Sequence, residues 1–230
     1  MKLSKRLTII SDMVQSGSRV CDVGTDHGYL PVFLYKSGKC ESICATDIRE
    51  KPLEKAKKNL SRSGASDVKL FLCDGLDLIS RDMADTIIIS GIGGEVISGI
   101  IDRALFLRDY TVTLIIQPTT GADKLREYLA SSGFMVACEK AVEDNGKLYS
   151  IMKCHFAGKA YPIDALRKSI GIIKPHYPDG IAYIEKQYRI ANKRASELES
   201  TGKNTVCYLE SKTVAEKIRK LLNKETGNGI

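Results

Sequence analysis

The fold of this chain is decided by residues 20–31, which read Val20-Cys21-Asp22-Val23-Gly24-Thr25-Asp26-His27-Gly28-Tyr29-Leu30-Pro31. Apolar residues lead to Asp22, and the spacing of Gly24 and Gly28 is typical of a buried strand that turns sharply into a helix. Glycines allow that turn and let a ligand approach the backbone closely. The stretch therefore predicts a nucleotide site, although two glycines also suit an ordinary turn between a strand and a helix.

Three more apolar stretches end in an acidic residue or a glycine. The first, 42–46, ends at Asp47, and the second, 68–73, ends at Asp74. The third, 85–90, runs directly into a glycine-rich loop. An acid in the position of Asp47 suits ribose hydroxyl groups, and Asp74 is placed to accept from an adenine amino group. Because ligands of parallel sheets bind at the carboxyl ends of the strands, we expect a cofactor site formed by Asp22, Gly24, Thr25, Gly28, Asp47, Ile48, Asp74, Gly75, Ser90 and Gly91.

Two cofactors that contain adenosine, NAD and S-adenosylmethionine, suit this arrangement. A pyrophosphate needs a free backbone at the middle of the glycine turn, where this chain has Asp26. A carboxylate there repels phosphates. S-adenosylmethionine carries no phosphate and has a positive sulfonium, so we favour it as the cofactor.

The order of elements predicts an α/β fold. Beta-branched strands alternate with expected helices at 3–15, 31–39, 51–63, 94–107 and 122–132, which indicates a parallel sheet covered on both faces. Two later stretches, 134–142 and 147–156, are separated by only four residues and must pair antiparallel. A parallel sheet that ends in an antiparallel hairpin is similar to the Rossmann-like sheet of class I S-adenosylmethionine-dependent methyltransferases. We assign residues 1–158 to this domain.

Residues 159–230 are richer in helix formers and form a second, helical domain in this prediction. A break is expected at Thr201-Gly202-Lys203-Asn204, so the two helices should fold back as an antiparallel, coiled-coil-like hairpin. The expected seam has spacings of three and four residues and consists of Ile181, Ile184, Tyr188, Ala191, Ala195 and Leu198 on the first helix, with Cys207, Val214, Ile218 and Leu221 on the second.

Positive charge is concentrated in this helical part. Residues 160–230 hold 13 Lys and Arg against 8 Asp and Glu, a net charge of +5 out of +7 for the whole chain. Such a face is either ordinary solvated surface or a basic arm for nucleic acid. Charge alone suits DNA, ribosomal RNA and tRNA equally. The candidate phosphate contacts are Lys186, Arg189, Lys193 and Arg194.

Composition excludes several classes of protein. With 43% hydrophobic and 27% charged residues, the chain is expected to be soluble and folded. The seven cysteines show no paired spacing of a zinc or redox site, and the three histidines are far apart, so we expect no metal. The sequence shows neither a signal peptide nor a long apolar segment, so we expect a cytoplasmic protein that does not enter a membrane, and we favour a monomer.

Several motifs resemble the bacterial tRNA (adenine-22-N1)-methyltransferase family across the whole chain. They are residues 22–31, Gly91-Ile92-Gly93-Gly94, Gln117-Pro118 and Leu3-Ser4-x-Arg6-Leu7. The resemblance implies transfer of a methyl group from S-adenosylmethionine to N1 of adenine 22 in tRNA. The chain has Thr25, Ile92 and Thr119 where the family usually has Ser, Met and Asn. Only the last change alters a side chain expected to face the substrate.

Methylation at N1 makes adenine cationic, which suggests roles for three residues. Asp26 would stabilise the developing charge, His27 would orient Asp26 or accept a proton, and Tyr29 would stack on the target base. Their alternatives are a helix cap for Asp26 and packing for the other two. The expected substrate contacts are Arg6, Gly93, Gly94, Gln117 and Pro118, together with the four basic residues of the helical domain.

Two other functions stay open at this point. One is a methyltransferase acting on another RNA or a small molecule. The other is a protein that binds S-adenosylmethionine and RNA without turnover.

Overall fold

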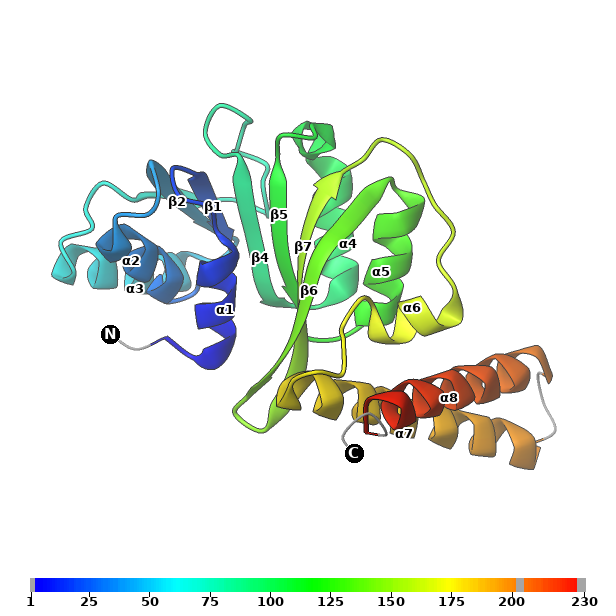
Figure 1. The fold of residues 1–230 in the computed structure, drawn as a ribbon. Helices are drawn as coiled ribbons and strands as arrows, with labels where there is room; N and C mark the ends of the chain where they lie inside the picture. The colour runs from blue at the N-terminus through cyan, green and yellow to red at the C-terminus, as the bar shows by residue number, and fades with distance from the viewer. Residues whose placement is uncertain (1–2, 202–204, 227–230) are drawn as a thin grey trace.

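The computed structural model describes residues 3–201 and 205–226, and its centre is a seven-stranded sheet in the order β3-β2-β1-β4-β5-β7-β6 (Figure 1). β7 runs antiparallel to both of its neighbours, whereas the pairs on the other side of β5 are parallel. This confirms the predicted sheet with its terminal hairpin. The strands are β1 (Arg19–Val23), β2 (Ser42–Asp47), β3 (Lys69–Leu72), β4 (Thr86–Ile92), β5 (Thr113–Pro118), β6 (Phe134–Asp144) and β7 (Lys147–Phe156).

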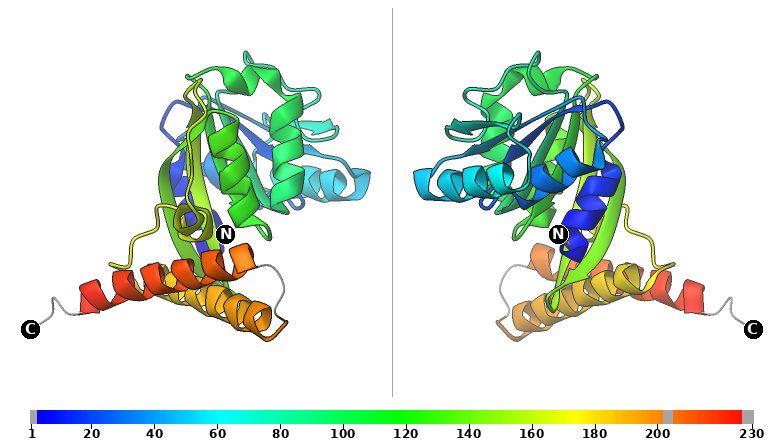
Figure 2. Two further views of the ribbon diagram at one scale, coloured as in Figure 1. Left: turned by 90° about the vertical axis from the view of Figure 1, so that its right-hand side faces the viewer. Right: turned by 90° about the vertical axis from the view of Figure 1, so that its left-hand side faces the viewer.

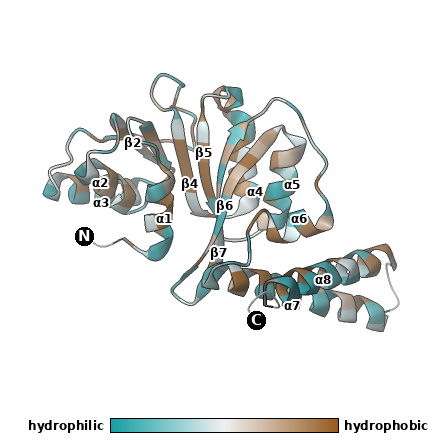
Figure 3. Cartoon of the chain, in the orientation of Figure 1, coloured by the Kyte–Doolittle hydropathy of each residue, from teal (hydrophilic) through white to brown (hydrophobic). Residues whose placement is uncertain are grey.

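Helices cover both faces of the sheet because the central strands are apolar on both sides. In β4, Ile88 packs into the cluster formed with α1 and α2, whereas Ile87 and Ile89 pack into the cluster formed with α4 and α5. All three side chains are fully buried. The central strands β4 and β5 are accordingly hydrophobic, whereas the helices carry many hydrophilic residues (Figure 3). The helices are α1 (Lys5–Met13), α2 (Tyr29–Ser37), α3 (Glu50–Arg62), α4 (Gly94–Arg103), the short 3-10 helix η1 (Leu105–Arg108) and α5 (Ala122–Ser131).

The strand order places a crevice at the carboxyl ends of β1 and β4. From β1 the chain proceeds outward through β2 and β3, and then returns to β4 on the other side of β1. The loops that follow β1 and β4 therefore separate in opposite directions. Ligands of open α/β sheets bind at such a point.

The C-terminal part forms the predicted helical hairpin, at the end of the sheet reached by the turn between β6 and β7 (Figures 1 and 2). It consists of α6 (Ala165–Ile170), α7 (Pro178–Thr201) and α8 (Thr205–Thr226). α7 contacts β6 and β7, and the Ala141 N–H of β6 donates to Tyr177 Oη at 2.8 Å. The break was predicted at residues 201–204; Thr201 is the last residue of α7, and residues 202–204 lie outside the described residues.

The interior of the hairpin differs from the predicted seam near the start of α7. Ile184, Ala191, Val214 and Ile218 are buried together as expected, but Ile181 is 37% exposed and Tyr183 is buried instead. The reason is that the first turns of α7 face the sheet as well as α8, and Tyr183 points to a buried arginine of α5. Within the described ranges, no helix is long and apolar enough to cross a membrane.

Candidate active site

A cleft of about 560 Å³, called here the main cleft, lies at the carboxyl ends of β1, β2 and β4. It brings together residues from five separate stretches of the chain. Most of the residues predicted for the cofactor and for catalysis line it. They are Asp22, Gly24, Thr25, Asp26, His27, Tyr29, Asp47, Ile48, Asp74, Gly75, Ser90 and Gly91. Arg6, which was predicted to contact the substrate, lines the main cleft as well.

The glycine turn after β1 is tied to the end of β2. The N–H groups of Gly24 and Thr25 both donate to the Thr46 carbonyl, at 2.9 and 3.1 Å. Gly24 has φ +72°, and a Cβ built on it would meet no atom within 4 Å. The turn therefore presents bare backbone to open space in the cleft, which lets a ligand approach closely.

Asp26 adopts a left-handed backbone conformation with φ +49°, which is unusual for a residue other than glycine. Its N–H donates to Asp47 Oδ2 at 3.3 Å, while Asp47 Oδ1 accepts from the Arg49 N–H at 2.9 Å. Asp47 thus holds the loops after β1 and β2 in place. Since an ionised carboxylate has about four acceptor sites, Asp47 can still accept hydrogen bonds from a ligand.

The carboxyl group of Asp22 is buried at the floor of the main cleft, with 6% of the residue exposed. Burial raises its pKa to about 7, and the negative charge of Asp47 adds to the increase. The Thr25 hydroxyl and the Arg6 guanidinium act in the opposite direction. A cation bound nearby would favour the ionised form of Asp22.

Asp74 and Gly75 form the wall of the main cleft after β3. Asp74 Oδ1 forms an ion pair with Arg103 Nη2 of α4 at 2.9 Å, and the Asp74 side chain is half exposed. The Gly75 carbonyl accepts from the Thr46 hydroxyl at 2.8 Å. Asp74 is therefore oriented by α4 and keeps free acceptor sites toward the cleft.

Three predicted catalytic residues lie together at the cleft. His27 Nδ1 is 3.1 Å from Asp26 Oδ1, and the rings of His27 and Tyr29 meet edge to face at 5.4 Å. The His27 carbonyl accepts from Asn59 Nδ2 of α3 at 2.9 Å, which fixes the backbone of the loop. The Asp26 side chain is 64% exposed and Tyr29 is 45% exposed, so a carboxylate and an aromatic ring are accessible side by side.

Arg6 reaches the main cleft from α1. Its Nη1 donates to Gln117 Oε1, its Nε lies 3.9 Å from Asp144 Oδ2, and its guanidinium lies 5.7 Å from the centre of the Tyr149 ring. A Cβ on Gly91 would lie 3.3 Å from Nη1. Arg6 therefore covers the carboxyl end of β4 and is held by Gln117 of β5 and by the β6–β7 hairpin.

Gln117 does not face the crevice as the sequence predicts. β5 extends to Pro118, two residues further than expected, so Gln117 lies inside the strand and is fully buried. Its Nε2 donates to the Pro118 carbonyl and its Oε1 accepts from Arg6. It can act on a substrate only through Arg6.

Other predicted residues also lie outside the lining of the main cleft. Gly28 caps α2 and packs against α3, where a Cβ would be 3.1 Å from Ala56 Cβ. Gly93 and Gly94 pack against the loop after β5, and a Cβ on Gly94 would be 2.7 Å from the Gly121 carbonyl oxygen. Pro118 at the end of β5 lines a second pocket together with Lys186 and Arg194 of α7, whereas Arg189 and Lys193 line neither pocket.

The sequence analysis missed most of the apolar lining of the main cleft. Ile48, which was predicted, is 65% exposed, and Val96 of α4, which was not, is 56% exposed. Apolar side chains this exposed beside carboxylates suit the faces of an adenine ring. Val96 could have been predicted, because apolar residues in the first helical turn after a glycine loop lie next to the site that the loop forms. The missed residues are Leu7, Val23, Leu30, Thr46, Arg49, Ile92, Val96 and Ile100.

The chemistry of the main cleft fits a cationic nucleoside better than a phosphorylated one. Four carboxylates, those of Asp22, Asp26, Asp47 and Asp74, line it against the guanidinium groups of Arg6 and Arg49. A pyrophosphate would be repelled by such a lining, whereas a sulfonium would not. In the part of the chain that the structure describes, no group of three or more His, Cys, Asp or Glu side chains could hold a metal ion.

Comparison with known proteins agrees with this chemistry. Residues 3–152 match a family model described as a methyltransferase domain. The tRNA (adenine(22)-N(1))-methyltransferase of Bacillus subtilis is 30% identical over 174 residues, which cover 75% of this chain and 73% of that protein. The chain belongs to the tRNA (adenine(22)-N(1))-methyltransferase family.

Solved structures of other proteins are similar to this chain over almost its whole length. A Streptococcus pneumoniae protein assigned as a tRNA (m1A22) methyltransferase, in complex with S-adenosyl-L-methionine, has a TM-score of 0.80 and 29% identity over 96% of this chain and 100% of that chain. A Streptococcus agalactiae protein of the NADB-Rossmann superfamily has a TM-score of 0.82 and 28% identity, over 96% and 98%. The helical hairpin is therefore shared with the methyltransferase-like neighbours.

The departures from the family pattern fall at different places in this methyltransferase. Thr25 and Ile92 line the main cleft, whereas Thr119 lines the second pocket and is exposed. The Thr119 N–H donates to the Ile92 carbonyl at 2.8 Å. This backbone bond does not depend on the side chain, so the change from Asn to Thr affects only the group that faces the second pocket.

Proposed function

We propose that this protein transfers a methyl group from S-adenosylmethionine to N1 of adenine 22 in tRNA. The observation that carries the proposal is the main cleft, in which four carboxylates surround bare glycine backbone and an exposed carboxylate and aromatic ring stand together. The Bacillus subtilis relative that bears this activity in its name supports the choice of substrate. A methyltransferase acting on a small molecule would not account for a basic helical hairpin.

The cofactor-binding role belongs to residues at the ends of β1, β2 and β3. Gly24 supplies the bare backbone, Asp47 the acceptor for ribose hydroxyls, and Asp74 the acceptor for an adenine amino group. Ile48 and Val96 offer apolar surface to the base. Bound S-adenosylmethionine supplies an electrophilic methyl group on a positive sulfonium.

Asp26 is placed to stabilise the positive charge that forms on the target adenine. N1 has an in-plane lone pair, so no proton has to leave before the attack, and catalysis rests on orientation and charge. The strained backbone of Asp26 is held by its hydrogen bond to Asp47. This couples the carboxylate that meets the substrate to the one that meets the cofactor.

His27 and Tyr29 complete the acceptor side in this proposal. His27 lies within ion-pair distance of Asp26 and orients it, or accepts the exocyclic amine proton once the ring is methylated. Tyr29 offers its exposed ring for stacking on an extruded base. Arg6 limits the site at the carboxyl end of β4 and supplies positive charge toward RNA.

The helical hairpin is the tRNA-binding unit in this proposal, and the enzyme acts in the cytoplasm. We divide the chain into a methyl-transfer unit, residues 1–158, and a basic helical unit, residues 159–230. The two share a core in which Ala141 of β6 packs with Ile184 and Ile218. A truncation at residue 158 would therefore expose apolar surface, so point variants are the cleaner test.

The proposal is tested by transfer of labelled methyl from S-adenosylmethionine to unmodified bulk tRNA, with the nucleosides separated by mass spectrometry. We expect 1-methyladenosine, and we expect it to disappear when the acceptor is a transcript in which adenine 22 is replaced by guanine. Donor binding without transfer, or methylation that persists on the altered transcript, would contradict the assignment.

A further inference from the structure

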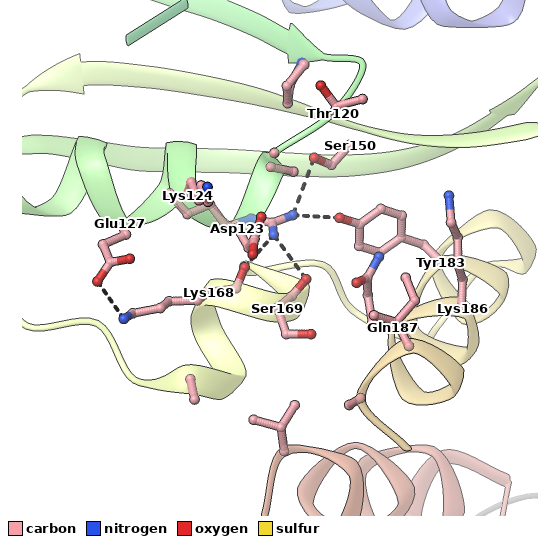
Figure 4. A pocket seen from close by; sticks show the side chains of 18 of the residues that line it. Thr120, Asp123, Lys124, Glu127, Ser150, Lys168, Ser169, Tyr183, Lys186 and Gln187 are labelled. Atoms are coloured by element: carbon pink, nitrogen blue, oxygen red, sulfur yellow. Dashed lines mark hydrogen bonds and ion pairs between the residues drawn. The ribbon is translucent and has the colours of Figure 1, made fainter. Parts of the chain in front are cut away.

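A second pocket of about 490 Å³, called here the side pocket, lies between the sheet and the helical hairpin (Figure 4). Its walls come from the β5–α5 loop, α5, β7, α6, α7 and α8. None of its residues lines the main cleft. Figure 4 shows Tyr183 and Lys186 of α7 entering from one side and Lys168 and Glu127 meeting on the other.

The floor of the side pocket is a fully bonded guanidinium. Arg126 donates to Glu139 Oε1 at 2.7 and 3.0 Å, to Tyr183 Oη at 2.9 Å, and to the Lys168 and Ser169 carbonyls at 2.6 and 3.0 Å. Arg126 and Glu139 are both buried. Because α5, β6, α6 and α7 all meet at this group, the pocket is preformed rather than a gap between loosely joined parts.

The rim of the side pocket carries basic side chains, most of which make no ion pair within the described residues. Lys168 is paired with Glu127 at 2.5 Å, but Lys124, Lys186 and Arg194 are exposed. Lys186 Nζ makes only a long contact of 3.5 Å with the Leu148 carbonyl within the described residues. The α5 N-terminus begins at the same rim and lacks a side-chain cap.

The opposite wall of the side pocket is partly apolar. It includes Tyr149 of β7 and Ile190 of α7, of which Ile190 is 52% exposed. Two acidic side chains, Asp123 and Glu210, also reach the lining, and their charge weakens the attraction for a simple inorganic anion. Aromatic and apolar surface beside basic groups is the composition that suits a base with its phosphate.

The linings of the side pocket and the main cleft contact each other. The Tyr149 ring that borders the side pocket is the ring over which Arg6 of the main cleft lies, at 5.7 Å. The Gly94 N–H donates to the Thr120 carbonyl at 2.9 Å, which joins the loop after β4 to the loop that forms the pocket edge. The two sites are therefore adjacent, so a single RNA strand can contact both.

We propose that the side pocket holds a second, unreacting nucleotide of the bound tRNA, with its base against Tyr149 and Ile190 and its phosphate among Lys124, Lys186 and Arg194. The inference rests on the proposed function, and it assigns to α7 a specific nucleotide site rather than a general basic surface. Holding a second nucleotide fixes the strand that presents the target adenine.

The test compares two double variants of the helical hairpin that remove the same charge. Lys186→Gln with Arg194→Gln alters the side pocket, whereas Arg219→Gln with Lys220→Gln alters exposed basic residues of α8 that line neither pocket. We expect the first to raise KM for tRNA at least about tenfold. It should also reduce the slope of log affinity against log salt by about 0.7 to 0.9 for each phosphate that the variant no longer neutralises. Affinity for S-adenosylmethionine should not change.

A direct measurement complements the variants. Ultraviolet crosslinking of the full chain to tRNA, followed by peptide mass spectrometry, should identify a peptide that contains Tyr149. Equal weakening of tRNA binding by both double variants, or no weakening by the first, would overturn the side-pocket site. Failure of the wild-type protein to methylate any tRNA would instead overturn the proposed function, so the two failures are distinguishable.

Discussion

Gln117 holds Arg6 at the edge of the main cleft by accepting a hydrogen bond from its guanidinium. Gln117 is fully buried in β5, whereas the Arg6 side chain is 24% exposed. A residue that cannot touch a substrate thus positions one that can. The Gln-Pro pair of the family motif is therefore explained by support of Arg6 rather than by contact with a base.

Replacing Gln117 by Met should separate these roles, because Met is of similar size and cannot accept the Arg6 hydrogen bond well. A hydrogen bond to a charged group contributes about 1.5–3 kcal/mol, so kcat/KM for tRNA should fall about tenfold to a hundredfold. Affinity for S-adenosylmethionine, measured by calorimetry, should stay within about twofold. The control is Lys5→Gln, an exposed charge on the same helix, which should leave both values unchanged.

Gly28→Ala should destabilise the protein more than an equivalent change at Gly38. Both residues are left-handed, with φ +69° and +62°, and an Ala there costs about 1–2 kcal/mol. At Gly28 the added Cβ would also lie 3.1 Å from Ala56 Cβ, whereas at Gly38 it would meet no atom within 4 Å. Denaturant unfolding should therefore show a larger decrease in stability for Gly28→Ala, by about 1 kcal/mol or more.

Equal decreases for the two variants would show that α3 can move away from the loop. Because Asn59 of α3 also holds the His27 carbonyl, such a movement would disturb the catalytic loop. We therefore expect Gly28→Ala, but not Gly38→Ala, to lower methyl transfer in the fraction that remains folded.

Asp26→Asn tests charge without altering shape. Asn tolerates the left-handed conformation that Asp26 adopts at φ +49°. If the carboxylate stabilises the cationic product ring, kcat should fall by about 10²- to 10³-fold, the size seen when one group that stabilises transition-state charge is removed. Single-turnover rates with saturating tRNA and donor are the measurement, and an unchanged rate with unchanged donor affinity would exclude the electrostatic role.

The sequence predicted the site residues whose positions follow from the local pattern, but not those whose positions depend on contacts with distant parts of the chain. Asp22, Gly24 and Asp47 follow strands at fixed spacings, and the sheet order alone brings them into one cleft. Gln117 was misplaced because β5 ends two residues later than expected, and strand ends are set by pairing with β4 rather than by local sequence. Pairing of this kind cannot be deduced from one strand.

The helical part shows the same limit. The spacing of apolar residues by three and four positions predicts the helical hairpin. It does not predict that Tyr183 faces α5 while Ile181 is exposed. Arg126, in the middle of an amphipathic helix, gives no sign that it is buried, because its partner Glu139 lies on a strand. The side pocket exists only because these distant groups meet, so no motif marks it.

Asp22 should make cofactor binding depend on pH near neutrality. Its pKa is raised to about 7, so below that pH the carboxyl is largely protonated in the free protein. A sulfonium or ammonium bound in the cleft favours the ionised form, so binding at about pH 6 must release a proton. Affinity for S-adenosylmethionine should therefore rise from about pH 6 to about pH 8 and then level off, and calorimetry in buffers of different ionisation enthalpy should detect the released proton.

Asp22→Asn is the matched variant, and it should remove this pH dependence. It should also change the stability profile, for which the sign follows from proton counting. Between the unfolded pKa near 4 and the folded pKa of about 7, the folded chain binds more protons than the unfolded one, so the free energy of unfolding contributed by Asp22 falls as pH rises through that window. The variant should lack that fall. The free energy of unfolding of the variant minus that of the wild type should therefore be larger at about pH 8 than at about pH 5. If the wild type bound the cofactor equally well at both ends of the pH range, with no proton released, Asp22 would keep the same protonation state on binding and this account of its burial would fail.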